Sequence, residues 1–332
     1  MKFGVGSKFT GGWKIDGVDF ADAQDAGVDA EIIGVTPENR KAHGLWIKNA
    51  KFTNIQGLRG TAGVFPAADA ACCGYVPFFA CSVTTTHVEQ VVLDNVESDS
   101  SDCPMWGFGG DGYWIKNGNF HDSLRNGLVY GGIGNDNGGA ISGATSVTPT
   151  SNLLVDSCTI SNSGSGFGST KGVAGIQISN GQDIIIQNST FTLNKSNSAD
   201  GVGIDIEGED PGAGPGGVTI PATYLIQGNT LSSNQGAAFL NNQAASTGWN
   251  SSSEVLINSN FFTSNANNSL PAIMGMRTGL TNINIVWTNN NTTRAVNTQQ
   301  KWAGNSTNTY TPLTNTTPTG YTYGASNTDH FP

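Results

Sequence analysis

A short pattern of apolar and turn-forming residues recurs nine times along the 332-residue chain. Each copy has an apolar residue, termed the anchor, with another apolar residue two positions before it. Gly, Asn or Ser stands two positions after the anchor in eight of the nine copies, Trp287 being the exception. A further apolar residue stands five positions after the anchor in seven copies. The anchors are Ile15, Ile47, Leu93, Ile115, Val155, Ile186, Ile226, Ile257 and Ile285.

This repeat predicts an all-β fold built from stacked coils. Apolar residues at alternating positions form a strand with one buried face, and Asn or Gly at the following turn tolerates left-handed backbone angles. The intervals between anchors are too long for the hairpins of a β-sandwich, and the leucine-rich repeat pattern is absent. We therefore expect a parallel β-helix, a solenoid of about 9–11 coils, with Asn side chains stacked in a ladder at one turn. Six anchors should share one interior column: Ile15, Ile47, Ile115, Ile186, Ile226 and Ile257.

The repeat carries a resemblance to a known group of proteins. The segment Ile185-Ile186-Gln187-Asn188-Ser189-Thr190-Phe191 resembles a coil of the pectin-lyase-like right-handed parallel β-helix superfamily. The resemblance runs from about Gly12 to Asn290 and implies a right-handed β-helix over residues 1–290. Residues 291–332 are expected to form an extended tail that packs on the solenoid or caps its last coil. The superfamily includes polysaccharide lyases, glycoside hydrolases, epimerases, phage tailspikes and adhesins, so the resemblance implies carbohydrate without naming a reaction.

Composition narrows the partners further. Charged residues make up only 12% of the chain and the net charge is −10, which argues against nucleic acid, whose phosphates need a basic surface. No run of 18 apolar residues occurs, so we expect no membrane span. Polysaccharide or another glycan is the expected partner, either neutral or acidic and bridged by cations. The oligomeric state cannot be deduced from these features.

The cysteines and the N-terminus bear on localisation. Cys72, Cys73, Cys81 and Cys103 crowd into one loop-rich stretch without the paired Cys-x₂-Cys spacing of zinc sites, so at least one disulfide is expected between two of them. Disulfides imply an oxidising compartment. Cys158 lies in a strand pattern and should be a buried thiol. The first residues lack the apolar core of a signal peptide, and we expect that the natural chain begins upstream of Met1 and loses a signal. An extracellular or cell-surface protein is predicted.

The densest acidic group of the chain contains the candidate catalytic residues. In the strand pattern around Asp205 and Glu207, the intervening Ile204 and Ile206 should face inward, so both carboxylates should point to solvent. Two residues along a strand span roughly 6.6 Å. Inverting glycosidases hold their carboxyl pair roughly 6.5–9.5 Å apart and retaining ones about 5–5.5 Å apart, so the spacing permits either outcome. Asp205 and Glu207 are therefore predicted to be the general acid and base, or nucleophile, of a glycoside hydrolase.

Residues near this pair are the candidate substrate-binding set. If neighbouring strands align as the repeat suggests, Gln177 lies on one side of the pair while Phe239 and Asn241 lie on the other. Asp210 follows in the same acidic group, and Trp106 belongs to an aromatic cluster in earlier coils. Amides, acids and aromatic rings together are typical of a sugar site.

Two other interpretations of the acidic strand remain open. It can be a solvated face without a function, and a partial echo at Gly27-Val28-Asp29-Ala30-Glu31 suggests that the motif belongs to the repeat. Alternatively, Asp205, Glu207 and Asp210 can bind a structural calcium ion, since hard cations take carboxylate oxygens. No cofactor or catalytic metal is predicted.

Aromatic and histidine residues complete the survey. Trp114 occupies the same repeat position as Trp46, so one exposed stripe should carry both rings, which either stack on sugars or close a loop. The four histidines show no metal-like spacing and are interpreted as structural or surface residues: His43, His87, His121 and His330. A secreted glycoside hydrolase is the leading prediction. A non-catalytic adhesin-like or tailspike-like glycan-binding solenoid is the alternative, and a polysaccharide lyase is a weaker one because no basic residue lies in a recognised pattern.

Overall fold

The computed structural model describes the repeated part of the chain and several later segments. The described residues are 2–3, 13–22, 28–32, 42–55, 78–82, 88–101, 103–108, 110–124, 126–131, 150–164, 173–179, 181–195, 201–207, 223–236, 238–241, 254–263, 274–277, 284–288, 291–294, 302–305, 310–312 and 321–323. They are all-β, and no helix long and apolar enough to cross a membrane is found among them.

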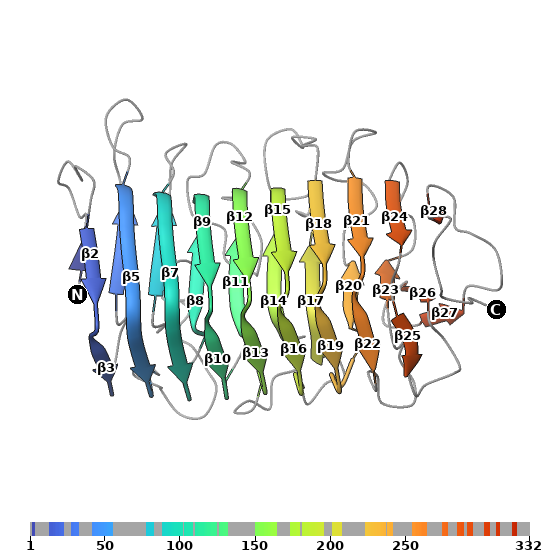
Figure 1. The fold of residues 1–332 in the computed structure, drawn as a ribbon, viewed down its shortest axis with the longest axis horizontal. Coiled ribbons are helices and arrows are strands. Elements are labelled where there is room, and N and C mark those ends of the chain that lie inside the picture. The colour runs from blue at the N-terminus through green and yellow to red at the C-terminus, as the bar shows by residue number, and fades with distance from the viewer. Residues whose placement is uncertain are drawn as a thin grey trace.

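The strands form two long sheets, between which the chain alternates (Figure 1). Sheet A has 11 strands: β1 (Lys2–Phe3), β4 (Val28–Ile32), β6 (Phe78–Ser82), β8 (Met105–Phe108), β11 (Leu128–Gly131), β14 (Val173–Ser179), β17 (Gly201–Glu207), β20 (Phe239–Asn241), β23 (Met274–Arg277), β26 (Trp302–Asn305) and β27 (Tyr310–Pro312).

Sheet B has 17 strands, most of them in pairs separated by one turn. They are β2 (Trp13–Asp16), β3 (Asp19–Ala21), β5 (Ala42–Thr53), β7 (Val88–Asp99), β9 (Gly110–Lys116), β10 (Asn119–His121), β12 (Thr150–Asp156), β13 (Thr159–Ser161), β15 (Gly181–Gln187), β16 (Thr190–Thr192), β18 (Thr223–Gln227), β19 (Thr230–Ser232), β21 (Glu254–Asn258), β22 (Phe261–Thr263), β24 (Asn284–Thr288), β25 (Asn291–Arg294) and β28 (Tyr321–Tyr323). Figure 1 shows the repeats following one another along the long axis in chain order. This arrangement is compatible with the predicted β-helix.

The anchors stack as the repeat predicted. Parallel register pairs Ile15 with Ile47, and the column continues through each of the next six anchors to Ile257. Ile15 is 6% exposed, and the other anchors of this column are at most 2% exposed. The position five residues after the anchor forms a second column that includes Phe52 and Phe120. The prediction of one interior column for the six isoleucines is confirmed.

The turn two residues after each anchor also follows the prediction. Left-handed backbone angles occur at every such position up to the eighth repeat: Gly17, Asn49, Asn95, Asn117, Ser157, Asn188, Gly228 and Ser259. Neighbouring repeats are joined there by side chains, since the Asn95 amide donates to Asn49 Oδ1 and the Asn49 amide donates to Asp16 Oδ1, both at 2.8 Å. The repeated Asn and Gly residues therefore serve the backbone geometry of this turn.

The ninth repeat corrects one assignment. Register pairs Ile257 with Trp287 and Val255 with Ile285, so the anchor is Trp287 rather than Ile285. The residue two positions later is then Asn289, which restores the turn residue that seemed to be missing. The sequence assignment was wrong because Ile283 and Ile285 alternate as the anchor pattern requires and Val286 follows directly. The pattern could therefore be aligned with the sequence in two ways.

A buried polar ladder lies one residue beyond the exposed turn. The backbone N–H of Ser189 donates to Asn229 Oδ1 at 2.9 Å, and the backbone N–H of Asn229 donates to Asn260 Oδ1 at 2.9 Å. The Asn229 side chain also donates to the Ile186 carbonyl at 2.9 Å. Asn229 and Asn260 are each 1% exposed. These side chains form hydrogen bonds with buried backbone groups that do not pair with a neighbouring strand.

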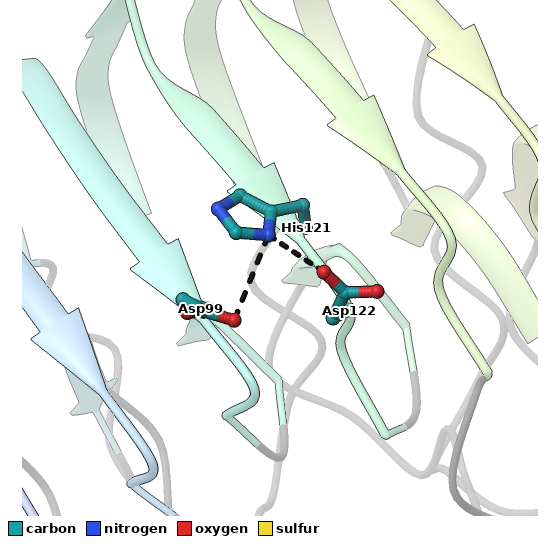
Figure 2. Close-up of side chains that lie close together, drawn as sticks. All are labelled: Asp99, His121 and Asp122. Carbon is teal, nitrogen blue, oxygen red and sulfur yellow. Dashed lines mark hydrogen bonds and ion pairs between the residues drawn. The ribbon is translucent and has the colours of Figure 1, made fainter.

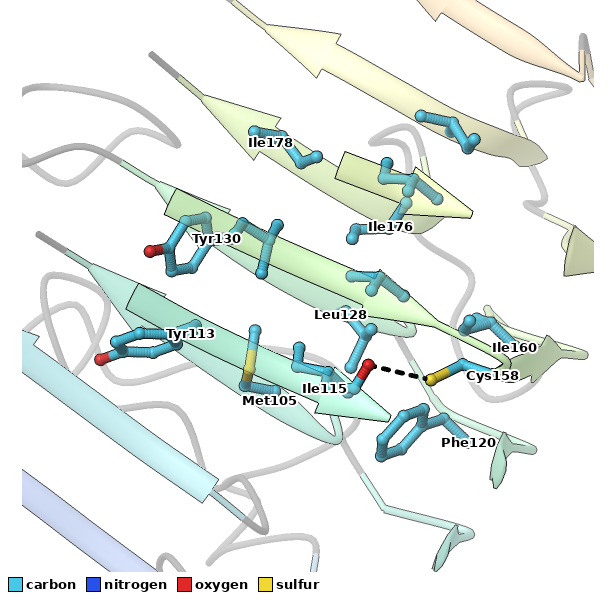
Figure 3. Close-up of a cluster of buried hydrophobic side chains, with 14 of the residues drawn as sticks. Met105, Tyr113, Ile115, Phe120, Leu128, Tyr130, Cys158, Ile160, Ile176 and Ile178 are labelled. Atoms are coloured by element: carbon cyan, nitrogen blue, oxygen red, sulfur yellow. Dashed lines mark hydrogen bonds between the residues drawn. The ribbon is translucent and has the colours of Figure 1, made fainter. Parts of the chain in front are cut away.

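Apolar side chains fill the space between the two sheets (Figure 3). Met105 and Leu128 from sheet A face Ile115 and Phe120 from sheet B. Cys158 is 2% exposed, and its thiol lies 3.5 Å from the Ile115 carbonyl oxygen, which confirms the predicted buried thiol.

Cys103 is not part of the predicted disulfide. It is 1% exposed and is a thiol rather than half of a disulfide, with Sγ lying 3.1 Å from the Met105 carbonyl oxygen. Cys72 and Cys73 lie outside the described residues, and the side chain of Cys81 does too, so a disulfide among these three stays a prediction.

Strands beyond residue 290 continue the sheet pairing. β25 pairs with β22, β26 with β23 and β28 with β24, all in parallel. β27 pairs with β26 in the antiparallel direction and is the last strand of sheet A. The tail was predicted to pack on the repeats or to cap them, and the division at residue 290 stays a prediction.

Candidate functional site

The outward column of sheet A contains three of the predicted site residues. Register places Trp106 beside Val129, Val129 beside Gln177, and Gln177 beside Asp205. Each step is one strand spacing of about 4.8 Å. The register therefore places an aromatic residue, an amide and an acid from three different repeats in one column, with Val129 of a fourth repeat between the first two.

Asp205 is more buried than the sequence predicted. It lies between Ile204 and Ile206, which are both 0% exposed in the core, so strand alternation directs it away from that core. Its exposure is nevertheless only 9%, and Gln177 beside it is 6% exposed. The expectation of a carboxylate open to solvent was wrong for Asp205, whereas the side chain of Glu207 lies outside the described residues.

Asn126 holds the amide of Gln177 in a defined orientation. The Asn126 side-chain N–H donates to Gln177 Oε1 at 2.5 Å, while Asn126 Oδ1 accepts from the Ala174 N–H at 2.9 Å. Asn126 comes from the turn that precedes β11 and Gln177 from β14. The neighbour of Asp205 is thus a fixed polar group, which a binding site requires.

Two of the predicted binding residues lie one register position away. Asp205 pairs with Leu240, whereas Phe239 pairs with Ile204 and Asn241 pairs with Ile206. The prediction that Phe239 and Asn241 flank the acid was therefore wrong. Alternation makes a shift of one residue exchange the two faces of a strand, so a one-residue error in a short apolar run misassigns every side chain.

The remaining residues of the acidic group are only partly described. Glu207 is the last residue of β17 and pairs with Ser179, but its side chain lies outside the described residues, as does all of Asp210. The prediction of a calcium ion at Asp205, Glu207 and Asp210 therefore stays a prediction.

The similar acidic segment near the N-terminus, which contains Asp29, lies in the same column of sheet A. Lys2, Asp29, Phe79 and Trp106 occupy successive positions of the column that leads to Asp205. Asp29 thus has the same place in an earlier repeat as Asp205 has in the later one. The repeat supplies the register position of both residues, and the side chain of Asp29 lies outside the described residues.

Sheet B carries the predicted aromatic stripe on its outer face. Trp46 pairs with Val92 and Val92 with Trp114, which places both indoles in one column about 9.6 Å apart, two strand spacings of about 4.8 Å each. Trp46 is 43% exposed and Trp114 is 50% exposed. Lys48 Nζ lies 5.7 Å from the Trp46 ring centroid and Lys116 Nζ lies 5.3 Å from that of Trp114. The expectation of one exposed stripe is confirmed.

A second polar cluster, not predicted from the sequence, lies where β7 and β10 end. His121 is the last residue of β10 and pairs with Asp99, the last residue of β7, and Asp122 follows with a left-handed φ of +55°. His121 Nδ1 lies 2.8 Å from Asp122 Oδ2 and 3.6 Å from Asp99 Oδ1 (Figure 2). The imidazole therefore stands between two carboxylates from adjacent repeats.

Charges around this cluster favour its ionised form. Burial of the ring lowers the pKa of His121, but the Asp122 hydrogen bond and the attraction of Asp99 and Glu97 more than offset it, so the pKa of His121 is raised. The hydrogen bond with His121 is the main reason that the pKa of Asp122 is lowered. Glu97 Oε1 lies 3.5 Å from His121 Nε2 and accepts a 2.8 Å hydrogen bond from Lys51, which lowers the pKa of Glu97.

An open groove begins at the same cluster. Its volume is about 620 Å³, and residues from four successive repeats line it. His121 and Asp122 lie in the first of these repeats, and Asn162, Lys195 and Gln235 follow in the next three. Leu193, which also lines the groove, is 54% exposed and has a φ of +57° at a turn position where the other repeats carry Asp, Asn or Ser. A branched side chain there is unusual in this backbone conformation.

The repeat contains the signal that would have identified this cluster. Asp99 stands six positions after its anchor Leu93, and His121 stands six positions after Ile115. Equal offsets in adjacent repeats place residues side by side. The interpretation of His121 from sequence relied on spacing along the chain, and that approach fails when ligands come from neighbouring repeats.

No protein-family model matches this chain, and no curated protein matches it.

Proposed function

We propose that this chain is a right-handed parallel β-helix of the pectin-lyase-like kind and that it acts outside the cytoplasm as a glycoside hydrolase on a polysaccharide. Support for the fold comes from the two long parallel sheets and the eight anchors in unbroken register from Ile15 to Ile257. Support for carbohydrate comes from the low charge of the chain and from an outer surface that carries amides, hydroxyls and exposed indoles.

One observation carries the catalytic part of the proposal: the Asp205 side chain is only 9% exposed although it does not belong to the apolar core. Removing a carboxyl group from water favours its protonated form, which is the form that a general acid needs. Gln177 lies directly beside it, and Asn126 fixes the Gln177 amide. A buried acid next to an oriented amide on an otherwise regular strand is typical of a functional site.

Glu207 is the proposed partner of Asp205. The two residues lie two positions apart on β17, and strand geometry separates such positions by roughly 6.6 Å on the same face. In the proposed reaction Asp205 protonates the glycosidic oxygen as it leaves. Glu207, ionised, either activates a water molecule or attacks the sugar carbon, and the separation of the two carboxyl groups decides between inversion and retention.

The exposed stripe on sheet B favours a second candidate function, non-catalytic glycan binding. Trp46 and Trp114 present apolar rings at an interval of about two strand spacings, and Lys48 and Lys116 lie next to them. Such rings suit a repetitive chain of sugars, since aromatic side chains bury a large apolar area and keep a polar edge. This surface lies on a different sheet from Asp205, so binding and cleavage can be tested separately.

A panel of polysaccharides with product detection by mass spectrometry tests the first candidate. We expect one substrate to be cleaved, and we expect Asp205→Asn and Glu207→Gln each to reduce turnover by about 10²-fold or more. Asp183→Asn is the matched control, because Asp183 is an exposed acid of sheet B bound to Thr223. Cleavage that survives both substitutions would refute the assignment of Asp205 and Glu207.

Affinity electrophoresis on the same panel tests the second candidate. Retention of the wild type without product, lost in Trp46→Ala and Trp114→Ala but kept in Asp205→Asn, would support binding alone. Retention that does not depend on either tryptophan would rule out the stripe as the binding surface.

A further inference from the structure

The geometry of Asp99, His121 and Asp122 points to a binding site for one divalent transition-metal ion, such as Mn²⁺ or Zn²⁺, at the end of the groove on sheet B. The inference does not rest on the proposed hydrolase activity, because it uses other residues on another sheet. It also differs from the calcium alternative at Asp205, which would use carboxylates alone.

Separations between the three ligand atoms suit a common metal ion. One nitrogen or oxygen atom from each of Asp99, His121 and Asp122 lies within 4.8 Å of the others. His121 Nδ1 lies 2.8 Å from Asp122 Oδ2 and 3.6 Å from Asp99 Oδ1. Metal–ligand distances of about 2.0–2.2 Å place adjacent ligands roughly 2.8–3.1 Å apart in octahedral geometry and roughly 3.3–3.6 Å apart in tetrahedral geometry. The two distances from His121 Nδ1 lie at the limits of these ranges, and all three ligand atoms are already within 4.8 Å of one another.

Neighbouring side chains orient all three proposed ligands. Asn162 donates to Asp122 Oδ1, leaving Asp122 Oδ2 on the His121 side, and Ser100 donates to Asp99 Oδ1 at 2.8 Å. Glu97 lies on the Nε2 side of the imidazole, at 3.5 Å. A carboxylate at the other ring nitrogen is the usual partner of a metal-bound histidine, because it fixes the tautomer and the ring orientation.

Ligand chemistry selects the class of ion. One imidazole with two carboxylates suits Mn²⁺, Fe²⁺, Co²⁺ or Zn²⁺, whereas Ca²⁺ takes six to eight oxygen ligands and has no preference for nitrogen. The imidazole also distinguishes this cluster from an ordinary acidic patch, which would bind cations without selectivity.

The groove leaves room for further ligands. His121 and Asp122 both line it, so an ion held there faces an open volume of about 620 Å³. Three protein ligands with open positions are the arrangement of sites at which a metal binds water or an external oxygen ligand. Amides and hydroxyls of Asn162, Ser161 and Gln235 continue along the same groove. The external ligand is therefore expected to be an oxygen-rich molecule that lies along the repeats.

Titration of the purified, metal-free protein with Mn²⁺, followed by the loss of the free-ion electron paramagnetic resonance signal, tests the inference. We expect one Mn²⁺ per chain, and binding weaker by at least about tenfold in His121→Gln and in Asp99→Asn. Asp94→Asn is the matched control: it removes the same charge from the same strand, at a residue paired with Lys48. Circular dichroism of each variant checks that the fold is retained, and two independent variants keep the test decisive if one fails to fold.

Three results would overturn the inference. They are the absence of Mn²⁺ binding by the wild type, an equal loss in Asp94→Asn, and binding that persists undiminished in His121→Gln. The last result would show that carboxylates alone hold the ion. Loss of polysaccharide cleavage in the Asp205 variants with Mn²⁺ binding intact would separate this site from the proposed catalytic one.

Discussion

The buried polar ladder provides the sharpest test of how this fold is held together. Replacing Asn229 by Ala removes an acceptor 2.9 Å from the Ser189 N–H and a donor 2.9 Å from the Ile186 carbonyl. Both partners lie in a core where Asn229 itself is 1% exposed, so water cannot easily replace the side chain. A buried polar group left without its partner costs about 1–3 kcal/mol, and two such groups give about 2–6 kcal/mol.

Two matched variants separate this effect from general damage. Asn188→Gly removes an exposed hydrogen bond of 3.0 Å to Asp156 while Gly keeps the left-handed φ of +51°, so we expect a loss below about 1 kcal/mol. Asn229→Ser should cost less than Asn229→Ala, because Ser189 already performs this role for the Cys158 N–H at 3.0 Å.

Urea denaturation followed by circular dichroism and by tryptophan fluorescence measures the free energy of unfolding. Coincident transitions from the two probes are needed, because arrays of repeats can unfold in parts. Expected losses decrease from Asn229→Ala through Asn229→Ser to Asn188→Gly. A loss for Asn229→Ala no larger than that for Asn188→Gly would refute the view that the ladder satisfies otherwise unpaired backbone groups.

Three further predictions use other parts of the structure. Burial raises the pKa of the Cys158 thiol to about 12. Iodoacetamide at about pH 8 should therefore leave Cys158 unlabelled in the native protein and label it after unfolding, which peptide mass mapping would show. Rapid labelling of the native protein would contradict this prediction. Burial opposes ionisation of Asp156, but hydrogen bonds from Asn188, Gln187 and Ser157 outweigh it and lower the pKa of Asp156. The ionised form therefore stabilises the fold above the unfolded-state pKa and ceases to do so as pH falls through the folded-state pKa. In urea denaturation, the difference in stability between wild type and Asp156→Asn should be largest near neutral pH and should shrink in acid. Gly203→Ala should be destabilised by about 1–3 kcal/mol or more, because the new Cβ would lie 2.6 Å from the Ala238 carbonyl oxygen. In Gly17→Ala the new Cβ meets no atom within 4 Å, so this control variant has only the cost of its left-handed φ. Equal losses of stability in thermal melts would argue against the close contact at Gly203.

The two candidate sites differ in how far the sequence could identify them. The Asp205 strand was found because two acids alternate with two isoleucines, which shows which side chains leave the core. Its neighbours were misassigned on one side only: Gln177 was placed correctly, but the short run Ala237-Ala238-Phe239-Leu240-Asn241 permits two phases. Residues of a short apolar strand cannot be assigned to a face until the register of the sheet is known.

The cluster around His121 was missed for a related reason. Its members stand at equal offsets from two anchors, but a histidine and an aspartate 22 positions apart in the chain form no recognisable motif. Their proximity follows from the parallel pairing of β7 and β10, which brings Asp99 beside His121.

Sequence alone determined the periodic features of this protein: the all-β class, the anchors, the residues two positions later that adopt left-handed angles, and the shared column of Trp46 and Trp114. Each of these depends on local rules, namely strand alternation and the backbone preferences of Gly and Asn, that act within a few residues. Tertiary structure alone decided the phase of the ninth repeat, the burial of Asp205 and the meeting of Asp99 with His121. These depend on which segments lie against one another across loops of unequal length, and no local preference encodes that.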